Sequence, residues 1–131
     1  MQQAPTYGNV VSEVRAFLKD QVAQCGTMGI APDRMLIDPG FGFGKTLQHN
    51  LQLLGGLGEL RTIGVPILFG MSRKRMLGSI TGRPTGERLA AGVAVATLAL
   101  ANGAAVVRSH DVAATVDAAA IVAALQSTAL D

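Results

Sequence analysis

Three short, uninterrupted apolar runs constrain the fold of this chain more than any other feature. They are Met35–Ile37, Ile67–Phe69 and Ala105–Val107, and each leads directly into polar or glycine-rich sequence. Such runs predict parallel strands buried on both faces, because a strand with one face in water alternates apolar and polar residues. Parallel strands need helical crossovers between them, so we predict an α/β architecture with three parallel strands.

Segments with helical spacing or helix-capping residues separate these runs. The five predicted helices cover Tyr7–Gly26, Thr46–Leu60, Arg73–Ile80, Glu87–Ala101 and Val112–Gln126. The buried face of the first should include Val10, Val14, Phe17, Leu18 and Val22, and that of the second Leu47, Leu51, Leu54 and Leu57. Thr46, Ser72 and Asp111 are the predicted N-caps. The predicted order is therefore α-β-α-β-αα-β-α.

The uncharged stretch Leu89–Val107 could be mistaken for a membrane span on hydropathy alone. Asn102 and Gly103 interrupt it with a helix-stop signal, and the apolar residues after them lead into Arg108. We therefore interpret the stretch as a buried helix, a turn and a buried strand, and we expect no association with a membrane.

Composition excludes several classes of protein. Hydrophobic residues make up 49% of the chain and charged residues 15%, which is the opposite of a disordered chain. A net charge of +2, with only four Phe and one Tyr, argues against a nucleic-acid partner. The single Cys25 and two histidines exclude an internal disulfide and a Cys/His zinc site. The N-terminal Met1–Thr6 lacks the character of a signal peptide, so a reducing cytoplasm is expected.

Polar side chains collect where each predicted strand ends. Asp38 and the loop Gly40–Lys45 follow the first strand, Ser72–Arg75 follows the second, and Arg108–Asp111 follows the third. Because parallel strands joined by helices end at the same edge of a sheet, we expect these groups to lie close together. That edge is where α/β folds place their sites.

The run Ser72–Arg75 indicates an anion. If Ser72 caps a helix, three cations lie in its first turn, where the helix dipole disfavours positive charge by roughly 0.3–1 kcal/mol each. A bound anion would reverse that penalty. Arg108 and His110 are two apart on a strand and share one face, whereas Ser109 points to the other face and offers mainly backbone.

Each of these features also has a purely structural interpretation. Asp38 before Pro39 could be a turn former, the loop Gly40–Lys45 a flexible connection, and His110 a hydrogen-bonded structural histidine. The two phenylalanines of the loop favour a wall for a ligand or partner, since they are costly to expose. The basic run could be a solvated face.

The segment from Gly40 to Thr46 approaches a P-loop pattern but is one residue short. The position of the first glycine falls on Pro39, which has no N–H to donate to a phosphate. A P-loop nucleotide binder is therefore a minor alternative.

Taken together, the three motifs resemble the dihydropteroate synthases, folate-pathway enzymes of the pterin-binding family. The resemblance rests on Asp38–Lys45, Gly70–Lys74 and Arg108–Asp111, in this order and spacing. It implies that the chain is the C-terminal part of a (β/α)₈ TIM barrel, typically about 250 residues long. Residues 1–131 would then be a partial pterin-binding domain whose N-terminal half is missing, and we expect it to be inactive alone.

The resemblance also implies roles for individual residues. Lys74, Arg108 and His110 would be catalytic. The substrate-binding residues would be Asp38, Phe43, Gly70, Ser72, Lys74, Arg108, Ser109 and His110. Asp38 would bind the edge of the pterin, Lys74 its ring, and Arg108 its face. His110 with Arg108 would hold the leaving diphosphate, Ser72 the carboxylate of 4-aminobenzoate, and Phe43 would wall the aminobenzoate pocket.

The implied reaction condenses 6-hydroxymethyl-7,8-dihydropterin diphosphate with 4-aminobenzoate to give 7,8-dihydropteroate and diphosphate. Mg²⁺ is the implied cofactor, held by the diphosphate and by residues absent from this chain, which itself supplies no metal ligand. The complete enzyme is expected to be a homodimer. A pterin-binding module of a methyltransferase in the same superfamily is the alternative.

Overall fold

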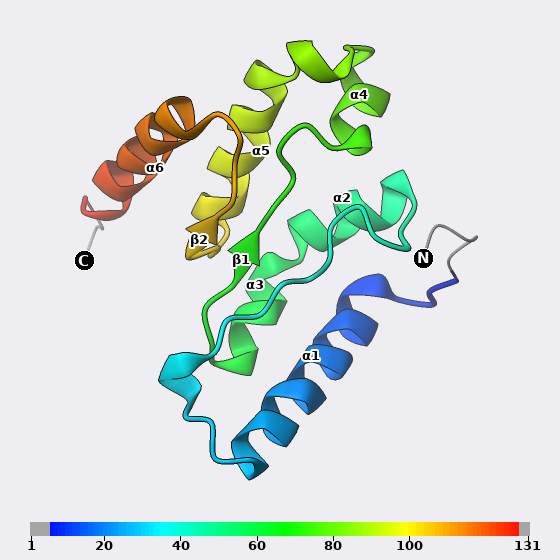
Figure 1. Ribbon diagram of the computed structural model, residues 1–131, viewed down its shortest axis with the longest axis vertical. Coiled ribbons are helices and arrows are strands. Elements are labelled where there is room, and N and C mark those ends of the chain that lie inside the picture. Colours follow the sequence, from blue (N-terminus) through cyan, green and yellow to red (C-terminus); the bar gives the residue numbers. More distant parts are fainter. Residues whose placement is uncertain (1–5, 129–131) are drawn as a thin grey trace.

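The computed structural model describes residues 6–128, a chain of helices around short parallel strands (Figure 1). Residues 1–5, most of the segment that argued against a signal peptide, lie outside the described residues. The helices and strands are α1 Val10–Thr27, α2 Leu47–Gly55, α3 Leu57–Leu60, β1 Leu68–Phe69, α4 Arg75–Thr81, α5 Leu89–Ala101, β2 Val106–Val107 and α6 Val112–Gln126. Short 3₁₀ turns at Pro32–Arg34, Arg61–Ile63 and Thr85–Glu87 connect some of them.

The three predicted strands lie side by side and run parallel, as expected, but they are shorter than predicted. Leu68 pairs with Val106 and Phe69 with Val107, while the first predicted strand contributes only a bridge between Ile37 and Ile67. Within residues 6–128 the segment at Ile37 and β2 each have a strand neighbour on one side only.

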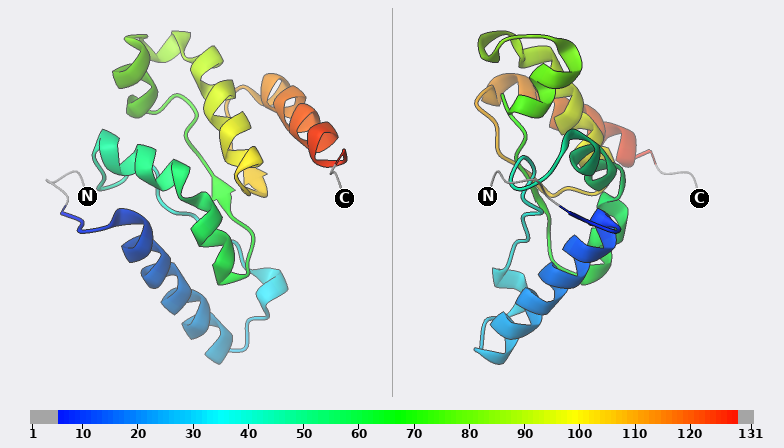
Figure 2. Two further views of the ribbon diagram at one scale, coloured as in Figure 1. Left: turned by 180° about the vertical axis from the view of Figure 1, so that it is seen from behind. Right: turned by 90° about the vertical axis from the view of Figure 1, so that its right-hand side faces the viewer.

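Helices pack in two groups beside these strands (Figures 1 and 2). α1 lies against α2 and α3, and α5 lies against α6, with the strands between the two groups. The core includes buried residues of α1, α2, α3 and β1. In it the rings of Phe41 and Phe69 pack edge to face, with centroids 4.9 Å apart. Phe41 is buried, so one of the two loop phenylalanines is a core residue and does not wall a ligand.

Helix α1 has a well-formed N-terminus. The Asn9 side chain accepts a hydrogen bond from the Ser12 N–H at 3.1 Å, and Glu13 accepts one from the Asn9 N–H at 3.0 Å. Its buried residues are Val10, Val11, Val14 and Leu18. The prediction that Phe17 is buried is wrong, since 62% of it is exposed. The apolar stripe of α1 is narrower than the spacing suggested, and Phe17 lies beside it.

The continuous helix predicted from Thr46 to Leu60 is wrong, because the helix divides at Gly56 into α2 and α3. Helix α1 approaches so closely here that a Cβ on Gly56 would lie 2.7 Å from Cγ2 of Val11. Leu47 and Leu51, expected to be buried, are about 40% exposed. The Thr46 cap is confirmed: its hydroxyl accepts from the His49 N–H at 3.1 Å.

The uncharged stretch before Arg108 forms the helix, turn and strand that were predicted, but the prediction that helix and strand are buried is wrong: only Ala96 and Ala99 of α5 are buried, and Val106 of β2 is 39% exposed. Helix α5 ends at Ala101, Gly103 turns the chain with a φ of 113°, and β2 follows. Between residues 6 and 128, no helix is both long and apolar enough to cross a membrane.

The outer faces of α5 and α6 expose large apolar side chains. They are Leu89, Leu98, Val112, Val116, Ile121 and Leu125, each between 48% and 69% exposed. Apolar surface of this kind favours association.

We predict that the chain by itself associates through this apolar surface. Light scattering should detect oligomers, and the exchange Ile121→Ser together with Leu125→Ser should reduce them because it removes exposed apolar area. Asp117→Ser, an exposed polar change on the same helix, is the control. A monodisperse native monomer with a sharp cooperative melt would contradict the prediction.

A second prediction concerns the contact between α1 and Gly56. Gly56→Ala should lower the free energy of unfolding by about 1–3 kcal/mol, because the new methyl group overpacks against Val11. Val11→Ala in the same chain should recover part of this loss. Gly58, which has open space around it, is the control: Gly58→Ala should stabilise by about 0.5–1 kcal/mol. Urea denaturation measures the three variants against the parent chain, and equal effects at the two glycines would refute the explanation.

Candidate functional site

A cavity of about 160 Å³ lies where the strands end. Its walls are formed by Gly70, Ser72, Lys74, Arg108, Ser109 and His110. The parallel strands therefore bring together six of the eight predicted site residues. A neighbouring cavity of about 320 Å³ shares Lys74 and is also lined by Phe43, Lys45 and Asn50.

The glycine-rich loop is held in place by hydrogen bonds within the chain. Gly40, Gly42 and Gly44 have positive φ angles, a conformation in which glycine carries no steric cost. The Lys45 ammonium folds back and donates to the carbonyls of Gly40 and Phe43, at 2.9 and 3.1 Å. A P-loop lysine would reach a phosphate instead, so the loop geometry argues against that alternative.

Asn50 holds this loop in place through hydrogen bonds, and the sequence analysis missed it. It is buried on α2, its side-chain oxygen accepts from the Gly42 N–H at 2.9 Å, and its amide donates to the Thr46 carbonyl at 3.0 Å. Its position in a leucine-rich helix could have identified Asn50 from the sequence, because a polar residue on a buried helix face needs hydrogen-bond partners.

Asp38 is exposed and acts as a turn former. One of its carboxylate oxygens accepts from the Gly40 N–H at 2.9 Å, which is the structural role considered for it. Asp38 also lies near Lys45 and Lys74, since its negative charge raises the pKa of both ammonium groups.

Lys74 lies over the loop at the centre of the site. Its ammonium donates to the Phe41 carbonyl at 2.6 Å and lies 4.4 Å from the centroid of the Phe43 ring. Burial lowers the pKa of Lys74, Arg108 and Lys45 lower it further, and Asp38 raises it. Burial likewise lowers the pKa of Lys45, against the effect of Asp38. An anion in the cavity would relieve the repulsion among these cations.

Ser72 does not cap a helix, contrary to the prediction. Helix α4 begins at Arg75, and Lys74 is the N-cap residue without a side-chain cap. The Ser72 hydroxyl instead accepts from the His110 N–H at 3.0 Å and lies 2.9 Å from Nδ1 of the same histidine. Only Arg75 of the three cations lies within α4, so the argument from the helix dipole does not hold.

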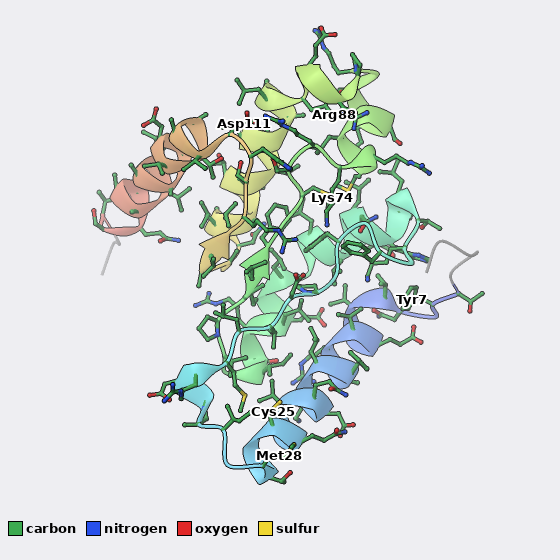
Figure 3. All side chains as sticks on the ribbon, in the orientation of Figure 1. Tyr7, Cys25, Met28, Lys74, Arg88 and Asp111 are labelled. Atoms are coloured by element: carbon green, nitrogen blue, oxygen red, sulfur yellow. The ribbon has the colours of Figure 1, made fainter. Side chains whose placement is uncertain are left out.

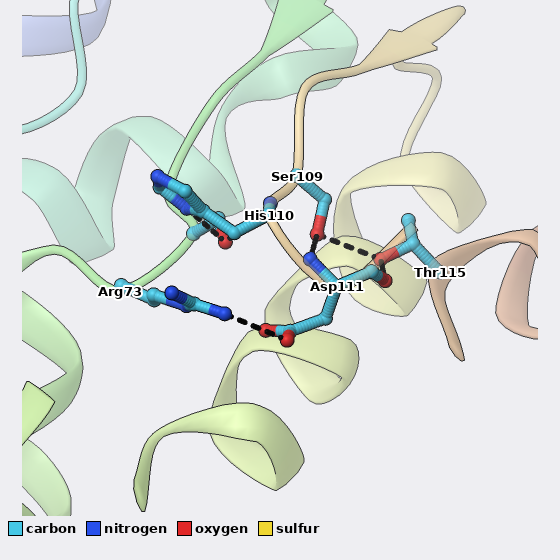
Figure 4. A network of polar contacts seen from close by, with 6 residues as sticks. Arg73, Ser109, His110, Asp111 and Thr115 are labelled. Atoms are coloured by element: carbon cyan, nitrogen blue, oxygen red, sulfur yellow. Dashed lines mark hydrogen bonds and ion pairs between the residues drawn. The ribbon is translucent and has the colours of Figure 1, made fainter. Parts of the chain in front are cut away.

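Arg73 adopts a left-handed conformation with a φ of 58° and reaches across to the next loop. Its guanidinium forms an ion pair with Asp111 at 3.0 Å (Figure 4). Asp111 does precede α6, but its carboxylate pairs with Arg73 and makes no cap hydrogen bond. The hydroxyl of Ser109 makes the hydrogen bonds at the start of α6 instead. It accepts from the Asp111 N–H at 3.0 Å and from Thr115 Oγ1 at 2.9 Å (Figure 4).

Arg108 packs against the backbone of Gly70. A Cβ at Gly70 would lie 2.5 Å from Nη2 of Arg108, so a side chain there would displace the guanidinium from its present position. The side chains that converge on the cavity are basic or hydroxylic, which suits an anionic ligand.

Comparison with known proteins identifies the family. The sequence model described as pterin binding enzyme matches residues 1–110. The chain belongs to the pterin binding enzyme family. The resemblance inferred from the three motifs is thereby confirmed.

Curated relatives of this pterin binding chain carry the name dihydropteroate synthase. The one from Escherichia coli K12 is 45% identical over 127 residues, covering 97% of this chain and 45% of the relative. The one from Neisseria meningitidis serogroup C is 51% identical over 120 residues, covering 90% of this chain and 42% of the relative. The chain spans less than half the length of these relatives.

Solved structures agree with this assignment. The Xanthomonas albilineans dihydropteroate synthase in complex with 7,8-dihydropteroate is 47% identical, with a TM-score of 0.92 over 98% of this chain and 50% of that one. The Yersinia pestis enzyme with a sulfonamide drug complex is 42% identical, with a TM-score of 0.94 over 98% of this chain and 47% of that one. Both are TIM barrels, so this chain forms part of a (β/α)₈ barrel and the predicted fold class is confirmed.

The charges around Lys74 lead to a prediction about the pKa of its ammonium. Asp38→Asn should lower the pKa of the Lys74 ammonium, because a neighbouring negative charge is lost, and Arg108→Met should raise it, because a neighbouring positive charge is lost. Heteronuclear NMR titration of the lysine side chains measures both changes. The signal of Lys19, on the exposed surface of α1, serves as the reference. Shifts of the same sign in both variants would show that the assumed arrangement is wrong.

Proposed function

We propose that this chain is the C-terminal half of a dihydropteroate synthase, an enzyme of folate biosynthesis. Its reaction would join 6-hydroxymethyl-7,8-dihydropterin diphosphate to 4-aminobenzoate. The observation that carries the proposal is the convergence of Lys74, Arg108 and His110 on one cavity at the strand ends. The shared name of the curated relatives and the dihydropteroate in the Xanthomonas structure support it.

One group of site residues would bind the pterin, and another would bind 4-aminobenzoate. Asp38 would accept hydrogen bonds from the amino-pyrimidinone edge of the pterin, a paired contact that fixes orientation. Lys74 would donate to the pterin ring, and Arg108 would stack on its face through the planar guanidinium. Ser72 would receive the carboxylate of 4-aminobenzoate, and the half-exposed Phe43 would form the wall of that pocket.

The chemistry needs charge stabilisation more than proton transfer. The bond between the pterin methylene and the diphosphate oxygen breaks, and the oxygen keeps the electron pair. The aminobenzoate nitrogen forms the new bond to the methylene and then releases its proton. Arg108 and His110 would stabilise the charge on the leaving diphosphate, while the backbone of Gly70 and Ser109 completes the wall of the cavity. Orientation of the two substrates supplies the rest of the acceleration.

The remaining features of the proposal concern the complete protein. Residues 1–131 would be its partial pterin-binding domain, closed into a barrel by an N-terminal half, and the enzyme would be a cytoplasmic homodimer. Mg²⁺ is proposed as cofactor of the complete barrel. Across residues 6–128 there is no group of three or more His, Cys, Asp or Glu side chains able to hold a metal ion. No step above uses the metal.

A barrel completed with the N-terminal part of the Escherichia coli relative tests the proposal. The fused protein should produce dihydropteroate, and Lys74→Met or Arg108→Met should each reduce substrate affinity. Losing a charged hydrogen-bond partner costs about 1.5–3 kcal/mol, which is about ten- to a hundredfold in Kd. Lys19→Met, on the exposed surface of α1, should leave affinity unchanged.

Two outcomes would count against this function. A folded barrel that forms no dihydropteroate would exclude the synthase. If calorimetry with such a barrel also detects no binding of diphosphate, the methyltransferase module becomes the better interpretation, because that module has no need for a diphosphate site.

A further inference from the structure

Arg88 makes a set of contacts that the roles described above do not use. It immediately precedes α5 and is half-buried, and Figure 3 labels it together with Lys74. Its guanidinium donates to three backbone carbonyls: Arg83 at 2.9 Å, Arg73 at 3.0 Å and Lys74 at 3.3 Å. Both ion pairs within residues 6–128 involve other arginines, so in this part of the chain Arg88 binds backbone and no carboxylate.

Gly78 provides the space that Arg88 occupies. The guanidinium lies against the backbone of α4 at this glycine, and a Cβ there would collide with the Arg88 Nη2, Cζ and Nε atoms. The φ angle of Gly78 is not in the left-handed region, so backbone conformation does not require glycine at this position. The requirement comes from the approach of Arg88.

The backbone that Arg88 holds is the turn that carries two site residues. Ser72 and Lys74 flank Arg73, whose left-handed conformation is strained for a residue with a side chain. The Lys74 N–H closes the turn by donating to the Met71 carbonyl at 3.1 Å. Such a turn keeps its shape only when its surroundings hold it. Arg88 supplies hydrogen bonds to the carbonyl of the strained residue itself and to the carbonyl of Lys74, the residue after it.

We propose that Arg88 is a positioning residue, which acts through the backbone of Arg73 and Lys74 to hold Ser72 and Lys74 at the cavity. The glycine at position 78 leaves the space that the Arg88 guanidinium occupies. The inference rests on the proposed function for its consequences in catalysis. A lysine cannot substitute, because two separate nitrogens, Nε and Nη1, make these bonds, whereas lysine carries a single ammonium.

The test compares two ways of displacing the guanidinium in the completed barrel. Arg88→Lys removes the fork but keeps the charge, and Gly78→Ala keeps Arg88 but fills its space. Both should raise the KM for 4-aminobenzoate and lower kcat, with a combined loss in kcat/KM on the order of 10²-fold, as expected for a small displacement of a site residue. Arg83→Lys and Gly86→Ala are the controls, since Arg83 is exposed and Gly86 has open space around it.

A second readout does not depend on turnover. The NMR signal of the Lys74 ammonium should move in Arg88→Lys and Gly78→Ala, and stay in place in both controls. A purely structural role for Arg88 would reduce the folded fraction and the Tm while leaving both the KM and the Lys74 signal unchanged, and that result would overturn the inference. If the parent barrel forms no dihydropteroate, the proposed function fails, whereas the Lys74 signal still decides the role of Arg88.

Discussion

Parallel backbone hydrogen bonds across the three strands decide where the polar groups of this protein can be. The Leu68 N–H donates to the Ile37 carbonyl at 2.8 Å, and the Arg108 N–H donates to the Phe69 carbonyl at 2.9 Å. These bonds set the register, so that the residues after each strand emerge at the same edge. The contacts of Lys74 with Phe41 and of Ser72 with His110 cross between segments that this register has already placed next to each other.

Electrostatics then distinguish this edge from the rest of the surface. The charges of Arg108 and Lys45 act on Lys74 there, and Asp38 is the carboxylate whose charge offsets them. Burial and the neighbouring cations lower the pKa of Lys74, which means that its surroundings disfavour the charge of its ammonium. Binding of an anion reverses this effect. The same groups that destabilise the free protein locally can therefore supply affinity for a diphosphate or a carboxylate.

Much of the fold could be predicted from local pattern. The continuous apolar runs identified all three strand positions, and the stop signal at Asn102 and Gly103 correctly separated α5 from β2. Prediction failed where packing between distant segments decides the structure. Helix α2 ends at Gly56 because α1 approaches it there, and Phe17 is exposed although its spacing fits a buried face. Neither fact is encoded in the periodicity of one helix.

The sequence by itself determined the order of strands and helices, and with it the set of residues that leave the strands at one edge. Only the tertiary structure decided how these residues are held. Ser72 binds His110, 38 positions away, in place of a helix N-terminus, and Arg73 turns left-handed to reach Asp111. Capping rules consider hydrogen bonds within a few residues, whereas these partners become neighbours only after the strands have aligned, when the long-range bond competes successfully with the local one.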